Sequence, residues 1–302
     1  MKRIIYFICI VFLLSACTEE ATPVPTQNGK SGGKEPVVKE PAAKSETLAG
    51  KLYFMKDNFI FSANTDGTGI TQISTTGESE KPDANPSVSL DGKYITYSNN
   101  KTKIYMIASA GGEEKLVANQ WFADHPVFSP DAAMVTFDME SYGMTIATAH
   151  TESGDFGKTY DSIYPRSWPH WSPTTKTVIA TQISNNGEYF KLITIDLDTK
   201  DAEILIDDPN VDYFFATYNY DGDKIAVIRA PTGTEDYSLW IMNADGSNGK
   251  ELVTDVTMAR PAWAPDGKHI AFEKDNSIFI MPVDGGDAKE VIKGGTAPAW
   301  GK

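Results

Sequence analysis

Residues 260–272 read RPAWAPDGKHIAF, and they decide the fold because closely similar stretches recur along the chain. The same pattern begins again at residues 85–97 (NPSVSLDGKYITY), 125–131 (HPVFSPD) and 168–173 (WPHWSP). A weaker copy covers residues 215–228 (FATYNYDGDKIAVI), and residues 297–301 (APAWG) open a sixth copy. Self-similarity of this kind, at a nearly fixed period, is the sequence signature of a repeat architecture.

The period of the repeat indicates the kind of unit that is repeated. The proline of each copy, or its equivalent, falls at residues 86, 126, 169, 216, 261 and 298, so the spacings are 40, 43, 47, 45 and 37 residues. Short alternating apolar runs separated by turn-forming pairs fill each copy, and no long window shows helical periodicity. Such a unit is typical of a four-stranded blade. We therefore predict an all-β protein, a six-bladed β-propeller.

The copies at the two ends of the repeat region predict how the ring closes. Residues 51–75 contain three strand-like runs but no first strand, whereas residues 297–300 form a first strand alone. We expect this C-terminal strand to complete the first blade by pairing near Leu52, because closure removes exposed strand edges. The aromatic residues after the proline are expected to pack between neighbouring blades; they are Phe128, Trp171, Trp263 and Trp300.

Asp-Gly and Gly-Gly pairs mark the predicted hairpins. Those between first and second strands are Asp91-Gly92, Asp221-Gly222 and Asp266-Gly267. Those between third and fourth strands are Asp66-Gly67, Gly111-Gly112, Asp245-Gly246 and Asp284-Gly285. Because these pairs suit turns with positive φ at both central residues, we expect primed turns at these places.

The N-terminus has the features of an export signal. Lys2 and Arg3 precede an apolar run over residues 4–14 that is too short to span a bilayer comfortably. Residues 14–17 (LSAC) resemble the lipobox of bacterial lipoproteins, which implies that residues 1–16 are removed and that Cys17 carries lipid. Residues 17–48 have the composition of a disordered tether, and residues 49–302 contain the propeller. We expect an extracytoplasmic protein anchored to a bacterial membrane, on its periplasmic side or at the cell surface.

The composition excludes several classes of function. With 27 basic and 41 acidic residues the net charge is −14, which disfavours nucleic-acid binding. Both cysteines, Cys9 and Cys17, lie near the N-terminus, so the repeat region has no cysteine-based zinc site. A Ser-His-Asp hydrolase would need a Gly-x-Ser-x-Gly motif and a separate domain, and the sequence has neither. We expect no cofactor, no nucleic-acid partner and a monomer.

The repeat resembles that of a known propeller family. The pattern Pro-x-Trp-Ser-Pro-Asp-Gly-Lys-x-Ile-Ala-Phe, followed by Ile-Tyr and Gly-Gly, looks like the TolB-type repeat of periplasmic TolB and of prolyl oligopeptidase relatives. The resemblance covers residues 50–302 and implies the fold of those propellers. The chain departs from the pattern at Thr174-Thr175, where Asp-Gly is expected, and in the fifth blade, whose opening lacks the proline. Because propellers host many activities, the resemblance implies the fold rather than one function.

The segments that link one blade to the next surround one mouth of the central channel and are the candidate binding site. Tryptophan, tyrosine and arginine, which dominate protein interfaces, are present there. The candidate residues are Trp121, Asp124, His125, Tyr164, Arg166, Trp168, Asp212, Tyr213 and Arg260. We therefore predict a non-catalytic scaffold that recognises a protein, a peptide or a glycan at this mouth.

Two other hypotheses stay open at this point. Oligogalacturonate lyases resemble TolB-type propellers and hold a divalent cation in the channel with His and Gln, which implies a metal-dependent carbohydrate-active enzyme as an alternative. Its candidate ligands are His125 and His170, which flank the proline of consecutive first strands and bind metals when neutral. The third hypothesis is a purely structural envelope component without a specific ligand.

Overall fold

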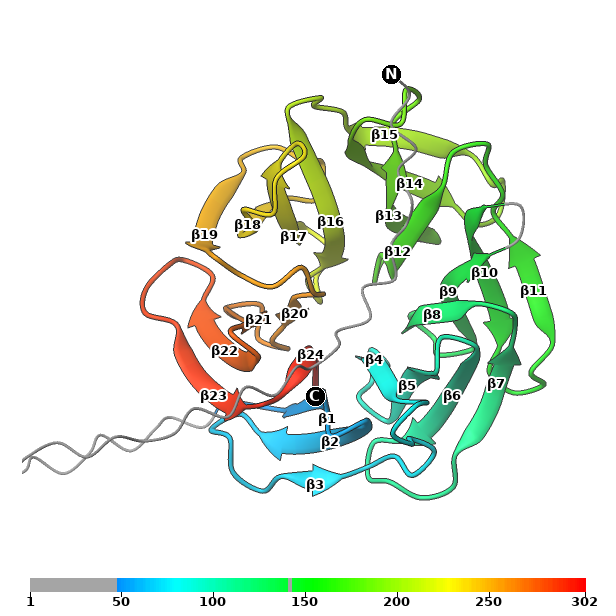
Figure 1. Ribbon diagram of the computed structural model, residues 1–302, viewed down its shortest axis with the longest axis vertical. Coiled ribbons are helices and arrows are strands. Elements are labelled where there is room, and N and C mark those ends of the chain that lie inside the picture. Colours follow the sequence, from blue (N-terminus) through cyan, green and yellow to red (C-terminus); the bar gives the residue numbers. More distant parts are fainter. Residues whose placement is uncertain (1–47, 141–142) are drawn as a thin grey trace, which may run out of the picture. The chain divides into compact units, whose positions relative to one another are not determined.

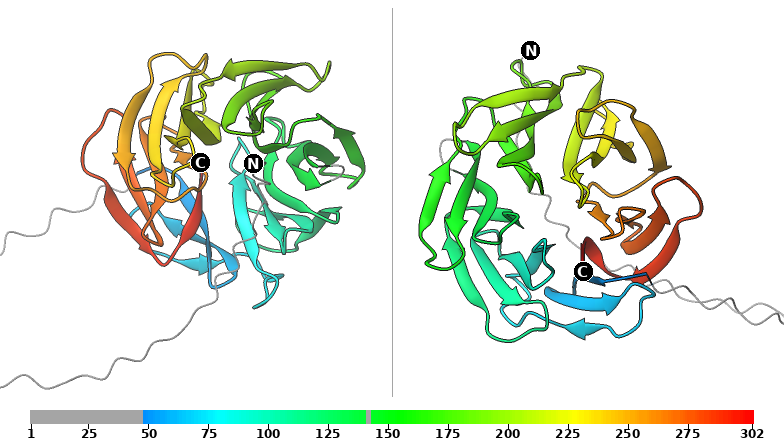
Figure 2. Two further views of the ribbon diagram at one scale, coloured as in Figure 1. Left: turned by 45° about the horizontal axis from the view of Figure 1, so that its top comes forward. Right: turned by 180° about the vertical axis from the view of Figure 1, so that it is seen from behind.

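The computed structural model describes residues 48–140 and 143–302. In this part of the chain, 24 strands form six four-stranded sheets, which Figures 1 and 2 show as blades around a central channel. The predicted six-bladed, all-β propeller is confirmed. No membrane-spanning helix occurs in the described ranges. The signal peptide, Cys17 and the tether up to residue 47 lie outside them and stay predictions.

In each of the first three blades the strands follow one another from the innermost to the outermost position. Blade 1 consists of β24 (Thr296–Gly301), β1 (Lys51–Lys56), β2 (Phe59–Asn64) and β3 (Thr71–Gln72). Blade 2 consists of β4 (Asp83–Val88), β5 (Tyr94–Asn99), β6 (Lys103–Ala108) and β7 (Lys115–Asn119). Blade 3 consists of β8 (Ala123–Phe128), β9 (Met134–Glu140), β10 (Met144–His150) and β11 (Phe156–Thr159).

The other three blades repeat this order. Blade 4 consists of β12 (Arg166–Trp171), β13 (Thr177–Ile183), β14 (Phe190–Asp196) and β15 (Ala202–Ile206). Blade 5 consists of β16 (Val211–Tyr218), β17 (Lys224–Pro231), β18 (Ser238–Asn243) and β19 (Lys250–Thr254). Blade 6 consists of β20 (Ala262–Trp263), β21 (His269–Lys274), β22 (Ser277–Pro282) and β23 (Lys289–Lys293).

Blade 1 closes the ring as the sequence predicts. The C-terminal strand β24 pairs antiparallel with β1, with Leu52 opposite Trp300 and Lys51 opposite Gly301. Figure 1 shows the two strands side by side, red beside blue. The indole Nε1 of Trp300 donates a hydrogen bond to the carbonyl oxygen of Ala49 at 3.0 Å, which adds a side-chain link to the backbone ladder.

The hairpins lie where the sequence predicts them, but their turn type is different. At residues 89–94, Gly92 has a φ of 77° while Asp91 does not have a positive φ, and Gly92 N donates to Ser89 O at 2.8 Å. The expected primed turn is therefore wrong here, because a longer connection places only its glycine in the left-handed region. Positive φ at both residues occurs at Gly111-Gly112, which is one of the predicted pairs. It also occurs at Asp57-Asn58 and at Asp275-Asn276, between second and third strands.

The apolar core consists of six clusters, one at each junction between neighbouring blades. The cluster between blades 1 and 6, for example, joins Leu52, Phe54 and Trp300 to Ile278 and Ile292. All four predicted aromatic residues are buried, at 4–6% exposure, and Trp171 Nε1 reaches Thr136 Oγ1 of the preceding blade at 2.8 Å. The prediction that these rings pack between blades is confirmed. Since each blade contributes to two clusters, no blade has an independent core.

Polar side chains on four second strands, three of them buried and one half-buried, tie each of these blades to the first strand of the next blade. They occupy the same register position, and they are Ser98, Asp138, Thr181 and Glu273. The contacts are Ser98 Oγ to Asp124 Oδ1 (2.6 Å), Trp168 N to Asp138 Oδ1 (2.8 Å), Thr181 Oγ1 to Tyr213 O (3.1 Å) and Ala297 N to Glu273 Oε2 (2.9 Å). These bonds fix the first strands around the channel.

Candidate functional site

Five of the six first strands carry a β-bulge at the same place, immediately before the proline position, and Arg260 occupies that sequence position in blade 6. The register shifts at this point in β4, β8, β12, β16 and β24. The bulged residue has a φ between 49° and 58°, although none of the five is glycine. We call the six residues at this position the pre-proline ring: Asn85, His125, Trp168, Phe215, Arg260 and Ala297. Bulges of this kind re-aim side chains, at a cost in backbone strain.

Three members of the pre-proline ring contact one another edge to face or at a tilt. The ring centroids of His125 and Phe215 are 5.3 Å apart, and those of Trp168 and Phe215 are 4.6 Å apart. Phe214 extends this group, with its ring centroid 5.7 Å from that of Trp168. Rings at these separations attract each other beyond their burial alone. The aromatic side chains of blades 3, 4 and 5 therefore meet in the channel and fix that half of the mouth.

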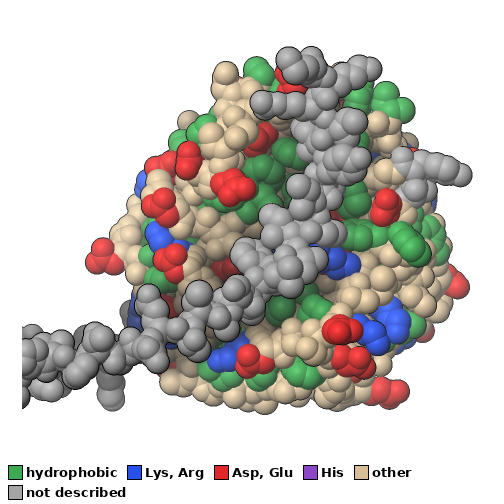
Figure 3. All heavy atoms as spheres, in the orientation of Figure 1, with side chains coloured by type: hydrophobic (Ala, Val, Ile, Leu, Met, Phe, Trp, Pro, Cys, Tyr) green, Lys and Arg blue, Asp and Glu red, His purple; other side chains and the backbone are tan. Residues whose placement is uncertain are grey.

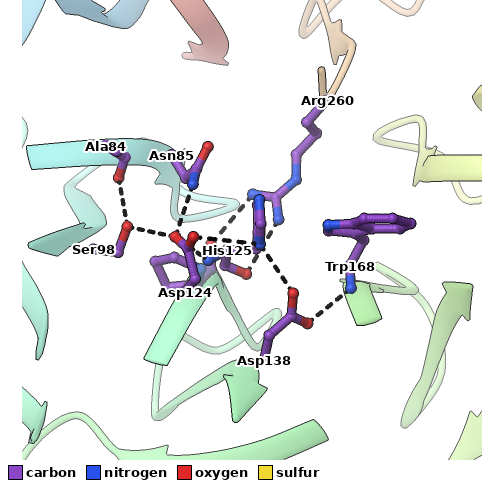
Figure 4. Close-up of polar contacts among 9 residues, drawn as sticks. Ala84, Asn85, Ser98, Asp124, His125, Asp138, Trp168 and Arg260 are labelled. Carbon is purple, nitrogen blue, oxygen red and sulfur yellow. Dashed lines mark hydrogen bonds and ion pairs between the residues drawn. The ribbon is translucent and has the colours of Figure 1, made fainter. Parts of the chain in front are cut away.

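Two buried carboxylates lie beside His125. Asp124 accepts hydrogen bonds from Ser98 Oγ at 2.6 Å, from Asn85 Nδ2 at 2.7 Å and from His125 N at 2.9 Å. Asp138 Oδ2 lies 2.9 Å from His125 Nδ1 (Figure 4). Burial acts to raise the pKa of Asp124, but His125 and these donors outweigh it and lower the pKa. Asp124 is therefore a structural anion at the mouth.

Arg260 crosses the channel and braces the ring. Its Nη1 and Nη2 donate to the carbonyl oxygens of Pro126 and His125 at 3.3 and 3.1 Å. Arg260 precedes blade 6 and these carbonyls belong to blade 3, so the side chain joins opposite blades, as Figure 4 shows in part. Burial lowers the pKa of Arg260 to about 10, and the carboxylates of Asp138 and Asp124 oppose that shift.

A cavity of about 110 Å³ lies further along the channel, lined by residues from all six first strands and the turns after them. Within its lining, Tyr218 N donates to His170 Nδ1 at 3.2 Å, and Tyr220 Oη donates to Trp300 O at 2.8 Å. Burial, with a contribution from Arg260, lowers the pKa of His170 to about 3. His170 is therefore neutral, and its Nδ1 also lies 3.1 Å from Trp171 O. The Tyr220 bond spans from blade 5 to blade 1.

The remaining sequence-predicted residues fall into two groups. Asp212 and Tyr213 are buried: Asp212 accepts from Phe190 N at 2.7 Å, and the Tyr213 ring lies under Arg229. Trp121 and Tyr164 lie in the connections that lead into β8 and β12, and Arg166 is the first residue of β12. Of these three, Trp121 is 86% exposed, Tyr164 is half-buried and Arg166 is buried.

The lyase-type metal hypothesis needs ligands that the described channel does not offer. The Nδ1 atoms of His125 and His170 contact Asp138 Oδ2 and Tyr218 N, so only the Nε2 atom of each imidazole is left to bind a metal ion. The guanidinium of Arg260 already supplies a cation beside Asp124 and Asp138. In the described ranges no group of three or more His, Cys, Asp or Glu side chains is arranged to hold a metal ion. The residues present do not fit that metal centre.

Sequence reasoning missed three members of the pre-proline ring. Asn85, Phe215 and Ala297 belong to it although their types drew no attention in the sequence. Their position in the repeat identifies them, because each residue immediately precedes the proline position of its copy. Aligning the six copies on that position would have identified the whole ring.

Comparison with known proteins supports the fold. No protein-family model matches the sequence, and no curated protein matches it either. TolB from Acinetobacter baumannii is similar in structure, with a TM-score of 0.71 and 20% identity over 84% of this chain and 67% of that one. A TolB-like protein from Agrobacterium tumefaciens has a TM-score of 0.63 and 18% identity, covering 83% and 92%.

A third similar structure bears on the enzymatic hypothesis. The oligogalacturonate lyase of Vibrio parahaemolyticus has a TM-score of 0.54 and 10% identity over 83% of this chain and 80% of that one. At these identities the likeness concerns architecture only. The chain therefore has the six-bladed propeller fold that TolB proteins also have.

Proposed function

We propose that this protein is a non-catalytic recognition scaffold whose channel mouth binds an exposed segment of a partner protein or peptide. The observation that carries the proposal is a pair of large apolar side chains left in solvent at that mouth. Trp121 is 86% exposed and Ile163 is 88% exposed. They lie in the connections that lead into β8 and β12, on either side of blade 3.

The position of the two residues supports binding rather than incidental exposure. Single exposed apolar residues are common on soluble proteins, but exposed tryptophan at an interface rim is a frequent hot spot. Met258, in the connection before β20, is a third apolar side chain at this mouth and is 37% exposed. On the face shown in Figure 3, acidic and basic side chains are interspersed along the periphery, with apolar side chains among them.

The same proposal includes the location of the protein. The lipobox-like residues 14–17 and the composition of residues 17–48 favour an extracytoplasmic scaffold anchored through lipid on Cys17. An attachment of two or more acyl chains gives stable anchoring. As a flexible chain, the 31 residues from Thr18 to Leu48 would extend on average about 30 Å, by the square-root rule. The mouth would then sample partners near the membrane without lying on it.

Photo-crosslinking in cells tests the proposal. The full chain carries a benzophenone amino acid at position 121 or 163, with position 204 as the matched control. Ile204 is 57% exposed but lies in β15, at the outer edge of blade 4. We expect the same crosslinked partner from positions 121 and 163 and not from 204. No product, or the same products from all three positions, would contradict the proposal.

Substitution and elemental analysis complete the test. Trp121→Ser and Ile163→Ser should each weaken capture of that partner at least tenfold while stability changes by less than about 0.5 kcal/mol, because both side chains are exposed. Stoichiometric manganese, zinc or calcium in the purified protein would favour the enzymatic alternative instead. A crosslinked partner whose capture is indifferent to both substitutions would favour a purely structural role.

A further inference from the structure

Arg166 is a buried cation at the channel mouth without an anionic partner. Its side chain is only 9% exposed. The Nε atom donates to Gln182 Oε1 at 2.8 Å, and Nη1 donates to the carbonyl oxygen of Tyr160 at 3.3 Å. Both acceptors are neutral, and burial lowers the pKa of Arg166 with no opposing charge nearby. A buried charge that is only partly compensated costs free energy, so its retention calls for a reason.

The other enclosed cations of this protein have counter-charges. Lys191 is 3% exposed and pairs with Asp207 at 3.2 Å. Arg260 lies in the field of Asp124 and Asp138. Arg166 is the exception in the described ranges, where no Asp or Glu forms an ion pair with it. The lack of a carboxylate partner therefore sets Arg166, at the start of blade 4, apart from these other cations.

The guanidinium of Arg166 keeps donors for a ligand. Arginine has five N–H groups, of which the bonds to Gln182 and Tyr160 use two. The Nη2 atom has no protein partner in the described ranges and is not among their fully buried unpaired atoms, so it reaches solvent. Two parallel N–H groups are what a carboxylate binds best. Ile163, 88% exposed, lies three residues earlier, in the connection that leads into β12.

We propose that Arg166 is a subsite for a carboxylate of the bound segment, supplied by an acidic side chain or by a C-terminus. The inference rests on the proposed function, because it assumes that the segment reaching Trp121 and Ile163 passes Arg166. Gln182 and the Tyr160 carbonyl hold the guanidinium in place, so the donors are pre-positioned before the ligand arrives. The protein therefore selects a segment that combines an apolar residue with a nearby carboxylate.

The arginine side chains give a direct assay. Residues 17–302 contain only three arginines, Arg166, Arg229 and Arg260, so the ¹⁵Nε–¹H spectrum of the mature protein is simple. The probes are acetyl-Leu-Glu-amide, with a side-chain carboxylate, and acetyl-Ile-Leu, with a terminal carboxylate. Acetyl-Leu-Gln-amide is the neutral control. We expect saturable shifts of the Arg166 signal, assigned from its loss in Arg166→Lys, with at least one carboxylate probe.

The outcomes separate this inference from the proposed function. In Arg166→Gln the ratio of carboxylate to neutral affinity should fall from tenfold or more to about one, a readout that loss of stability alone does not produce. Equal shifts with the neutral probe, or none with any carboxylate, overturn the inference. Shifts only with inorganic phosphate or with galacturonate overturn it too. Crosslinking from positions 121 and 163 stands independently, so a partner captured equally well by Arg166→Gln would refute the subsite and leave the scaffold.

Discussion

Replacing Arg260 tests whether the channel is braced across the ring. Arg260→Met keeps an apolar stem of similar length and removes the charge and both bonds to blade 3. A hydrogen bond from a charged donor contributes about 1.5–3 kcal/mol, and the distances of 3.1 and 3.3 Å place both bonds at the weak end. Two such bonds together contribute about 3 kcal/mol.

The carboxylates near Arg260 add to the effect of the substitution. Asp124 and Asp138 are each 1% exposed and would lose their cationic neighbour. Removing one partner from a buried charged group costs about 3–5 kcal/mol. We therefore expect Arg260→Met to lower the free energy of unfolding by about 3 kcal/mol or more. Arg229→Met is the matched control, because Arg229 stacks on Trp240 at 3.9 Å and should contribute only about 1 kcal/mol.

Urea unfolding at pH 7, followed by circular dichroism, measures both variants and a double-mutant cycle with Asp138→Asn. The amide can keep a bond to Trp168 N while removing the negative charge. Neutralising Asp138 should therefore matter less once Arg260 is gone, with a coupling energy of about 1–3 kcal/mol. If Arg260→Met costs less than 1 kcal/mol, or the two changes add within about 0.5 kcal/mol, the bracing argument is wrong.

Three further predictions concern other parts of the propeller. The pKa of His170 is lowered to about 3 in the folded protein, so the unfolded chain binds a proton at this histidine at higher pH than the folded protein does. The free energy of unfolding should therefore fall as the pH drops below 6.5, by about 1.4 kcal/mol per pH unit. Urea unfolding between pH 6.5 and 5 should show this slope lost in His170→Asn and kept in His150→Asn. Trp300→Ala removes a buried ring from the closing strand and should cost about 3–5 kcal/mol in urea unfolding, and a cost below 1 kcal/mol would mean that closure does not depend on this side chain. Gly50→Ala places a Cβ at 2.1 Å from Gly301 O, whereas Gly267→Ala meets no atom within 4 Å, so thermal unfolding should show the larger loss for Gly50→Ala although both positions have positive φ.

The fold could be predicted from the sequence because the same strand and turn pattern recurs in each blade. Proline-aromatic openings and Asp-Gly pairs recur at intervals that fix the blade count, and the unmatched strand over residues 297–300 predicts closure. The turn type was less accessible. Asp91-Gly92 fits a primed turn as a dipeptide, but the strands end at Val88 and resume at Tyr94, so strand ends rather than the pair set the loop.

The candidate site was predictable only in part, because a repeat locates a residue on its blade and not across the ring. Arg260 belongs to the predicted mouth, yet its partners His125 and Pro126 are 135 and 134 residues away in sequence and on the opposite blade. Arg166 is the first residue of β12, three residues before Pro169, whereas Arg260 directly precedes Pro261. Neither position indicates from the sequence which guanidinium faces carboxylates. The difference is whether carboxylates happen to face each guanidinium, and that depends on second-strand residues such as Asp138.

The pre-proline ring separates the residues that hold the propeller together from those that can recognise a partner. Its position is structurally repeated while its six side chains differ, and two of them also contribute to a cluster between blades, because Phe215 belongs to the cluster of blades 5 and 6 and Trp168 packs against it. In this protein the ring is used internally: His125 and Trp168 both contact Phe215, and Arg260 is bonded to backbone carbonyls. Side chains whose polar atoms and ring faces already contact one another have few groups available to bind a ligand. Recognition is therefore expected outside the ring, where Trp121 is in solvent and Arg166 lacks an anion.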